Sequence, residues 1–92
     1  MEVRLEIPEY SPDTAMKYNW EPGFDIGVRY ENGVIFLTAN REGLFSLTNH
    51  FLNLSQEKTP EGYHLHFDEN NSLEEGSVEL IIQKNEKWFC FY

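Results

Sequence analysis

The pattern of apolar and polar residues predicts five short β-strands. They cover residues 2–7, 24–30, 34–39, 63–67 and 78–83, and apolar and polar residues alternate in all of them except the third. A period of two residues places successive side chains on opposite faces of a strand. The third stretch is almost wholly apolar, which is typical of a central strand that is covered on both faces.

A hairpin turn and one helix complete the predicted elements. Asn32-Gly33 tolerates positive φ at both positions and favours a tight β-hairpin. Asn40 can cap the amide groups of a helix, which we expect over residues 41–57. The expected core-facing stripe consists of Leu44, Leu47, Thr48, Phe51 and Leu54. Gly43, in the first turn, would allow the helix to approach a strand closely.

Together these elements predict a single α+β domain over residues 1–92. The expected order is β-β-β-α-β-β, in an antiparallel sheet of five or six strands with one amphipathic helix packed on one face. Residues 8–23 form a long loop, and residues 85–92 form an aromatic C-terminal extension that could supply the sixth strand. The second face of the sheet then either forms an interface or lies under the loop and the extension.

The charge balance narrows the choice of partners. The chain has 16 acidic and 7 basic residues and a net charge of −9. Such a field repels nucleic acid and anionic membranes and attracts basic protein surfaces, although acidity also serves solubility. One cysteine, Cys90, excludes an intrachain disulfide and fits the cytoplasm. No signal peptide and no apolar run of membrane-spanning length is present in this sequence.

Acidic residues concentrate in one region, which predicts a protein-binding surface. Asp68, Glu69, Glu74, Glu75 and Glu79 fall within a loop and the strand that follows it. We expect these residues, with Trp20 and Glu21 of the long loop, to contact a partner. A negative patch accelerates association with a basic partner. The alternative is an acidic loop that is merely solvated.

The sequence predicts no catalytic site and no cofactor. The serines do not lie in a strand-turn-helix elbow, the glycines match no phosphate-binding loop, and Cys90 lies among aromatic residues. His64, His66 and Asp68 are spaced to share one face of a strand, which is a weak metal-site pattern. Polar residues on the solvent face of a strand give the same spacing.

Several short motifs together resemble a known family. Asn40-Arg41-Glu42-Gly43-Leu44 leads into the helix, His64-Leu65-His66-Phe67-Asp68 follows, and Leu73-Glu74-Glu75-Gly76-Ser77 precedes the last predicted strand. With Trp20-Glu21 upstream, this ordered set resembles immunity protein family 32 of bacterial polymorphic toxin systems, over about residues 16–84. The matching positions are Trp20, Asn40, Arg41, Gly43, His64, His66, Asp68, Gly76 and Ser77.

The resemblance implies a cytosolic, non-enzymatic antidote with an α+β fold that binds and blocks a cognate toxin domain. Many such toxins are nucleases with basic clefts, so a basic nuclease domain is one candidate partner. Nucleic acid and membranes are not expected as partners. Two alternatives stay open at this point: a structural or regulatory module that self-associates as a homodimer, and a metal-binding domain that uses the two histidines.

Overall fold

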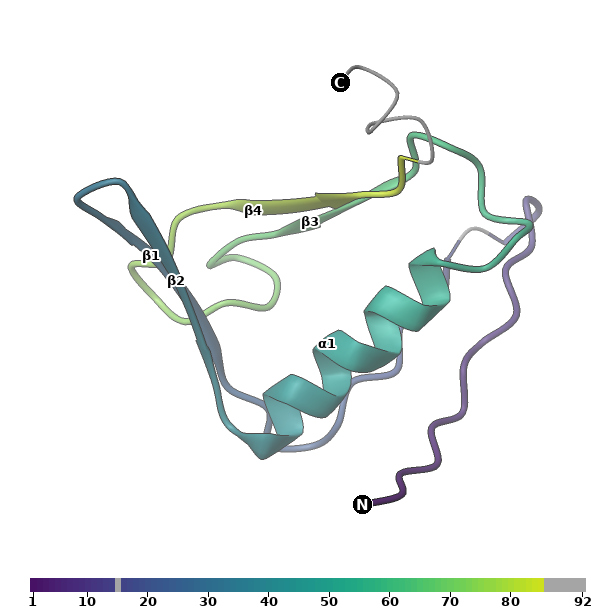
Figure 1. Ribbon diagram of the computed structural model, residues 1–92, viewed down its shortest axis with the longest axis horizontal. Helices are drawn as coiled ribbons and strands as arrows, with labels where there is room; N and C mark the ends of the chain where they lie inside the picture. Colours follow the sequence, from purple (N-terminus) through teal and green to yellow (C-terminus); the bar gives the residue numbers. More distant parts are fainter. Residues whose placement is uncertain (15, 86–92) are drawn as a thin grey trace.

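The computed structural model describes residues 1–14 and 16–85, and these residues contain one helix and four strands. In chain order the elements are β1 (Ile26–Glu31), β2 (Val34–Ala39), α1 (Arg41–Leu54), β3 (His64–Phe67) and β4 (Leu80–Gln83). The α+β class is confirmed, but the single sheet of five or six strands is wrong. The strands form two separate antiparallel pairs, β1–β2 and β3–β4. These pairs and α1 make three sides of a triangle (Figure 1).

The β1–β2 hairpin follows the sequence prediction. Asn32 and Gly33 have φ of 51° and 81°, as a two-residue turn of this kind requires. Glu31 lies opposite Val34, and the pairing continues to Ile26 opposite Ala39.

The predicted strand over residues 2–7 is wrong, because this segment forms no strand. The carbonyl oxygen of Glu6 accepts hydrogen bonds from the side-chain amides of Asn19 (3.0 Å) and Asn49 (2.9 Å). Side chains therefore satisfy backbone groups that a neighbouring strand would otherwise bind. The alternating apolar residues of this segment are not all buried, since Val3 is 46% exposed.

The two sheets are joined by an irregular segment that runs along the outer edge of β1. The amide of Glu74 donates to the carbonyl of Ile26 (2.8 Å), and the amide of Val78 donates to that of Val28 (2.9 Å). Between them, the Ser77 hydroxyl accepts from the Val28 amide (3.1 Å). A hydroxyl thus replaces a backbone carbonyl, so no regular ladder forms and β4 begins only at residue 80. The predicted sixth strand lies outside the described residues.

Asn40 fixes the junction between the hairpin and α1. Its side-chain oxygen accepts from the amides of Gly43 (2.8 Å) and Asp25 (3.0 Å), and its side-chain nitrogen donates to the carbonyl of Gly23 (2.9 Å). The predicted helix cap is therefore confirmed. The helix ends at Leu54, three residues before the predicted end.

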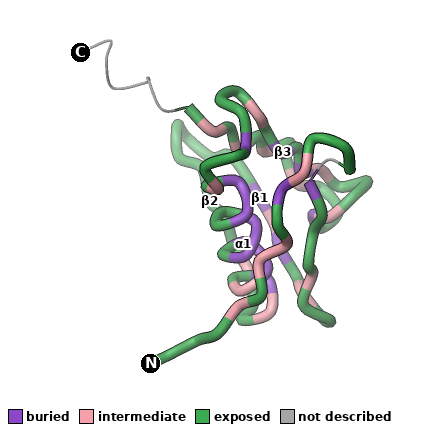
Figure 2. The backbone as a smooth tube through the Cα atoms, turned by 90° about the vertical axis from the view of Figure 1, so that its right-hand side faces the viewer, coloured by how far each residue is buried: buried purple, intermediate pink, exposed green. Residues whose placement is uncertain are grey.

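The helix turns its polar side towards the protein interior, contrary to the predicted stripe. Leu47 and Leu54 are buried as expected, but Leu44 and Phe51 are 51% and 44% exposed. Thr48, the remaining member of the stripe, is also exposed. The polar residues on the buried side are Ser46, Asn49, His50 and Asn53. Figure 2 shows buried residues gathered along α1, facing the N-terminal segment.

These buried polar side chains bind the backbone of the N-terminal segment. Asn53 donates to the carbonyl of Lys17 (2.6 Å), and the Ser46 hydroxyl accepts from the Glu21 amide (2.9 Å). Two residues beyond the helix, Gln56 donates to the carbonyl of Pro8 (2.8 Å) and accepts from the amide of Tyr10 (3.0 Å). Ser46, Asn49, Asn53 and Gln56 all bind backbone groups of the N-terminal segment through their side chains, and we call these four residues the amide ladder. Three of them bind through a side-chain amide, and Ser46 binds through its hydroxyl.

The hydrophobic core lies between the ladder side of α1 and the inner faces of both strand pairs. Its buried residues are Tyr10, Met16, Ile26, Val28, Leu47, Leu54, Leu65, Phe67 and Leu73. Tyr10 and Met16 come from the long loop over residues 8–23, so this loop supplies side chains to the core.

Gly43 provides the closest approach between the helix and the hairpin, and it generates a first prediction. A Cβ atom at this position would lie 2.7 Å from the Asp25 carbonyl oxygen and 2.9 Å from Ile26 Cγ1. Gly43→Ala should therefore lower the free energy of unfolding by about 1–3 kcal/mol, despite the higher helix propensity of alanine. Urea denaturation measures the change. Thr48→Ala, at an exposed helix position, is the matched control, and an equal loss in both variants would contradict the steric explanation.

Candidate functional site

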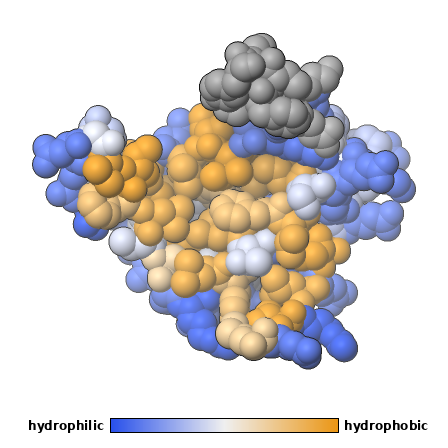
Figure 3. All heavy atoms as spheres, in the orientation of Figure 1, coloured by the Kyte–Doolittle hydropathy of each residue, from blue (hydrophilic) through white to orange (hydrophobic). Residues whose placement is uncertain are grey.

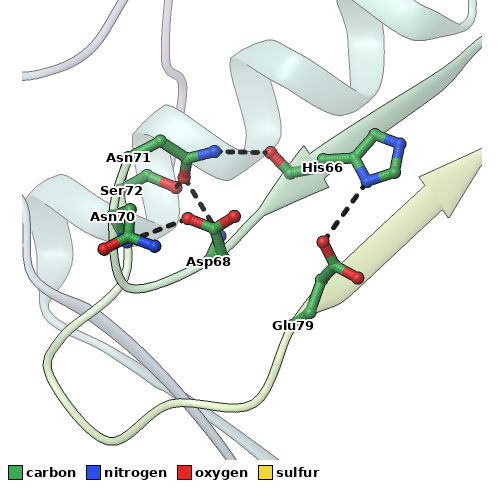
Figure 4. A network of polar contacts seen from close by, with 6 residues as sticks. All are labelled: His66, Asp68, Asn70, Asn71, Ser72 and Glu79. Carbon is green, nitrogen blue, oxygen red and sulfur yellow. Dashed lines mark hydrogen bonds and ion pairs between the residues drawn. The ribbon is translucent and has the colours of Figure 1, made fainter.

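The acidic segment over residues 68–79 is a folded loop with its own hydrogen bonds. The Asp68 carboxylate accepts from the amide of Asn70 (2.8 Å). Asn71 accepts from the Asp68 amide (3.0 Å) and donates to the carbonyl of His66 (3.1 Å), as Figure 4 shows. These bonds fix the loop where it leaves β3 and hold the Asp68 carboxylate in a defined position.

Two further carboxylates close the loop. Glu69 accepts from the amide of Gly76 (2.8 Å), which has a φ of 88° and so turns the chain back towards β1. Glu79 lies 3.5 Å from Nδ1 of His66 on the neighbouring strand (Figure 4). Both members of this ion pair are about half exposed, so it contributes little to stability and leaves negative charge on the surface.

Glu74 lies beside a second carboxyl group that the sequence pattern did not single out. The neighbouring Asp25 carboxylate raises the pKa of Glu74 by charge repulsion and by a hydrogen bond between the two side chains. Two adjacent carboxylates repel one another, and a positive group placed between them relieves that repulsion. This pair is therefore a position where a lysine or arginine of a partner would be stabilised.

An open hollow of about 260 Å³ adjoins the acidic loop, between it and the outer face of the hairpin. Its lining consists of Gly27, Val28, Arg29, Thr38, Glu74, Glu75, Gly76 and Ser77. The single basic residue in this lining, Arg29, pairs with Glu31 and lies over the ring of Phe36. Glu74 and Glu75 therefore give the hollow a negative character that suits a cationic side chain.

Trp20 lies at a second hollow, of about 230 Å³, on the other side of the acidic loop. This hollow is lined by Tyr18, Trp20, His66, Phe67, Asn71 and Ser72. The indole ring is only partly exposed, since it stacks on Phe24 with ring centroids 4.5 Å apart. Trp20 therefore helps to cover the core and also presents an edge beside the loop.

The structure brings together most of the residues predicted to bind a partner. Asp68, Glu69, Glu74, Glu75 and Glu79 belong to one loop, and Trp20 shares a hollow with it. Glu21 is exposed, but it lines neither hollow, and its backbone amide and carbonyl bind Ser46 and Phe24. Asp25 was missed because it lies 49 positions before Glu74, and no local pattern connects the two.

The two histidines of the metal hypothesis lie side by side, with ring centroids 4.8 Å apart. Each ring already has another contact, since His64 Nδ1 is 3.1 Å from the Gly62 carbonyl and His66 faces Glu79. Asp68 binds its own loop instead. Within residues 1–14 and 16–85, no three histidine, cysteine or carboxylate side chains group as metal ligands.

The sequence pattern that defines the family described as Immunity protein 32 matches residues 34–85. This match covers more than half of the chain and runs from β2 to the end of β4, so it includes the whole acidic loop. The chain belongs to the Immunity protein 32 family. The resemblance noted in the sequence is therefore confirmed, while Trp20 and Glu21 precede the matched residues.

The family membership brings no ready-made description of the binding site. Neither the curated proteins nor the solved structures contain a significant match to the chain. In the part of the chain that the structure describes, no helix has the length and apolar character needed to span a membrane.

His50 lies beneath the Trp20 hollow and is an unusual core residue. It is fully buried, and neither ring nitrogen has a hydrogen-bond partner among the described residues. Its ring contacts Trp20 (4.3 Å between centroids) and Tyr18 (5.3 Å). Burial disfavours the charged imidazolium and lowers the pKa of His50 to about 4 from its ordinary value of 6.5.

The lowered pKa of His50 predicts a loss of stability in mild acid. The unfolded chain takes up a proton on this residue at higher pH than the folded chain, so the stabilisation present above pH 6.5 declines as the pH falls towards 4. His50→Leu should remove about 1–2 kcal/mol of the difference in unfolding free energy between pH 7 and pH 5. Urea denaturation at both values checks this, and an unchanged difference would contradict it. Exposed His64→Leu is the control.

Proposed function

We propose that this protein is an immunity protein that binds a cognate bacterial toxin domain in the cytoplasm and neutralises it by occupying its surface. The observation that carries the proposal is the family match over residues 34–85. The proposed role is binding rather than catalysis, and it needs no cofactor.

The acidic loop is the part of the molecule best suited to contact a basic toxin. It carries five carboxylates on a segment held by its own hydrogen bonds, so little conformational entropy is lost on binding. Asp25 adds a sixth carboxylate beside Glu74. Repulsion within this pair is present in the free protein and is relieved when a cation binds, which favours the complex over the free state.

A basic nuclease domain fits this surface as the toxin. The active-site cleft of a nuclease carries positive charge because it binds phosphates, and a carboxylate-lined loop can take the place of the phosphate backbone. Trp20, at the edge of the second hollow, offers an aromatic contact beside the charged one, and tryptophan is enriched among the residues that dominate interface energies.

The first test is co-purification of the tagged full-length protein from its own cells at low and high salt, followed by titration with the purified toxin domain. We expect a complex whose dissociation constant rises as salt screens the acidic loop. Co-expression with the toxin should restore growth. Failure to bind or protect against any toxin encoded beside its own gene would contradict the immunity function.

A pair of substitutions tests the acidic face directly. Glu74→Gln with Glu75→Gln should weaken toxin binding about tenfold or more, because both side chains line the 260 Å³ hollow. The melting temperature should not fall, since the change relieves repulsion with Asp25. Isothermal titration and thermal denaturation measure the two effects.

The matched control is Glu2→Gln with Glu57→Gln, which removes the same charge from exposed positions outside the hollow. Equal weakening in both double variants would show that net charge, rather than the loop, determines the affinity. A low dissociation constant that changes neither with salt nor in either double variant would show that the toxin binds another surface.

A further inference from the structure

β2 is an apolar strand that is exposed on both of its faces. Val34 and Phe36 lie on the face that bears Arg29, and they are 50% and 39% exposed. Ile35 and Leu37 lie on the face that bears Val28, and they are 64% and 40% exposed. Natural proteins usually protect an edge strand with charged residues, proline or a bulge, and β2 has none of these.

The backbone of β2 also has unpaired groups along its outer edge. The carbonyls of Ile26 and Val28 point away from β2, because they accept from the 74–78 segment. In an antiparallel pair, directly opposite residues both point towards or both point away from the partner strand. Leu37, which lies opposite Val28, and Ile35, two positions away, therefore direct their amides and carbonyls outwards. These groups have no hydrogen-bond partner within residues 1–14 and 16–85.

The same side of the molecule continues as an apolar surface beyond the strand. Figure 3, in the orientation of Figure 1, shows hydrophobic residues gathered over β2, α1 and the β3–β4 pair. α1, whose polar side faces the protein interior, contributes Leu44 and Phe51 to this exposed apolar surface. A contiguous surface of this kind, next to a free strand edge, is typical of a protein interface.

We propose that two copies of the chain pair through this edge, with their β2 strands antiparallel about a two-fold axis at Phe36. Ile35 of each copy then exchanges two backbone hydrogen bonds with Leu37 of the second copy, so both outward-facing residues are satisfied. The two hairpins become one four-stranded sheet in the order β1-β2-β2-β1.

This register places only compatible side chains opposite one another. On one face, Ile35 meets Leu37 of the second copy. On the other face, the two Phe36 rings meet at the axis, and each has the guanidinium of its own Arg29 lying 4.3 Å from the ring centroid. Aromatic and aliphatic cross-strand pairs stabilise a sheet, whereas like charges directly opposite destabilise it.

The charge distribution favours a second copy of this chain as the occupant. Two chains of net charge −9 repel one another over most of their surfaces. β2 carries no charged residue, so the strand edge avoids this repulsion. A two-fold interface requires a self-complementary patch, and an antiparallel strand edge is self-complementary by geometry. Stable interfaces bury about 800 Å² per partner, so the adjoining apolar residues of α1 are needed as well.

The first measurement is sedimentation equilibrium of the full chain between about 5 and 200 µM. We expect a species of twice the 10.9 kDa chain mass. Ile35→Lys should weaken the dimer about tenfold or more, because it places a charge opposite Leu37 of the second copy. The control, Val3→Lys, replaces an apolar residue with lysine at a 46% exposed position in the N-terminal segment, outside β2, α1 and the β3–β4 pair. A single-chain mass at 200 µM would overturn the proposal. That outcome would also cover the case in which the β2 edge binds a strand of the toxin and not a second copy of this chain.

Disulfide trapping tests the register independently, in a Cys90→Ser background. At the axis, the two Phe36 Cα atoms form a pair without hydrogen bonds, about 4.5 Å apart, which is within the range for a disulfide. Phe36→Cys should therefore give a covalent dimer under mild oxidation. In this register Val34 lies opposite Thr38, which leaves the two Val34 residues roughly 13 Å apart. Val34→Cys should stay monomeric under the same conditions, and equal cross-linking of both variants would overturn the register.

Discussion

The amide ladder on α1 determines how the rest of the chain is arranged. Backbone groups of a segment without secondary structure need hydrogen-bond partners when they lie against a protein interior. Asn49, Asn53 and Gln56 supply those partners to residues between Glu6 and Lys17, at distances of 2.6–3.0 Å. The segment therefore packs as part of the domain although it is neither a strand nor a helix. Truncating a ladder side chain leaves both a buried backbone group and a cavity without compensation.

Because the ladder residues of α1 face the protein interior, apolar residues lie on the exposed side of the helix. A helix has one buried side, and when polar residues occupy it, apolar residues such as Leu44 and Phe51 remain outside. The molecule consequently carries two chemically distinct surfaces: an acidic one at the 68–79 loop and an apolar one over β2 and α1. In protein complexes generally, charged surfaces accelerate association and make it selective, whereas contacts between apolar surfaces are not weakened by salt.

The parts of the fold that the sequence predicted are those set by neighbouring residues. The Asn32-Gly33 turn and the Asn40 cap each depend on a few adjacent positions, and each is present in the structure. The close approach at Gly43 was also predicted, because a glycine inside a helix is itself a local signal, although the residues that it approaches are distant in sequence. The extent of the sheet could not be predicted in this way. Alternation over residues 2–7 indicates a strand, but the Asn49 side chain on α1 binds the Glu6 carbonyl of this segment from 43 positions away. Tertiary contacts thus override local pattern.

The orientation of α1 and the carboxyl pair at Asp25 were hidden for a related reason. Apolar residues at helical spacing identify the stripe but do not say which side is buried, and here Asn53 and His50 occupy the interior. The acidic residues of the loop are close in sequence, so their grouping was visible. Asp25 joins Glu74 only because the loop returns to the edge of β1. A candidate site assembled from two distant segments has no signature in either segment alone.

The contacts across the chain also set the order in which the domain can form during synthesis. The ladder bonds join residues 25–48 positions apart, and the bond between Val28 and Ser77 spans 49. The hairpin and the helix can form as they leave the ribosome. The N-terminal segment must wait for the helix, and the outer edge of β1 must wait for the loop to supply its hydrogen-bond partners. The acidic surface comes into existence last. If the acidic loop is the binding surface, as proposed above, the capacity to bind follows the number of completed chains rather than the number of chains begun.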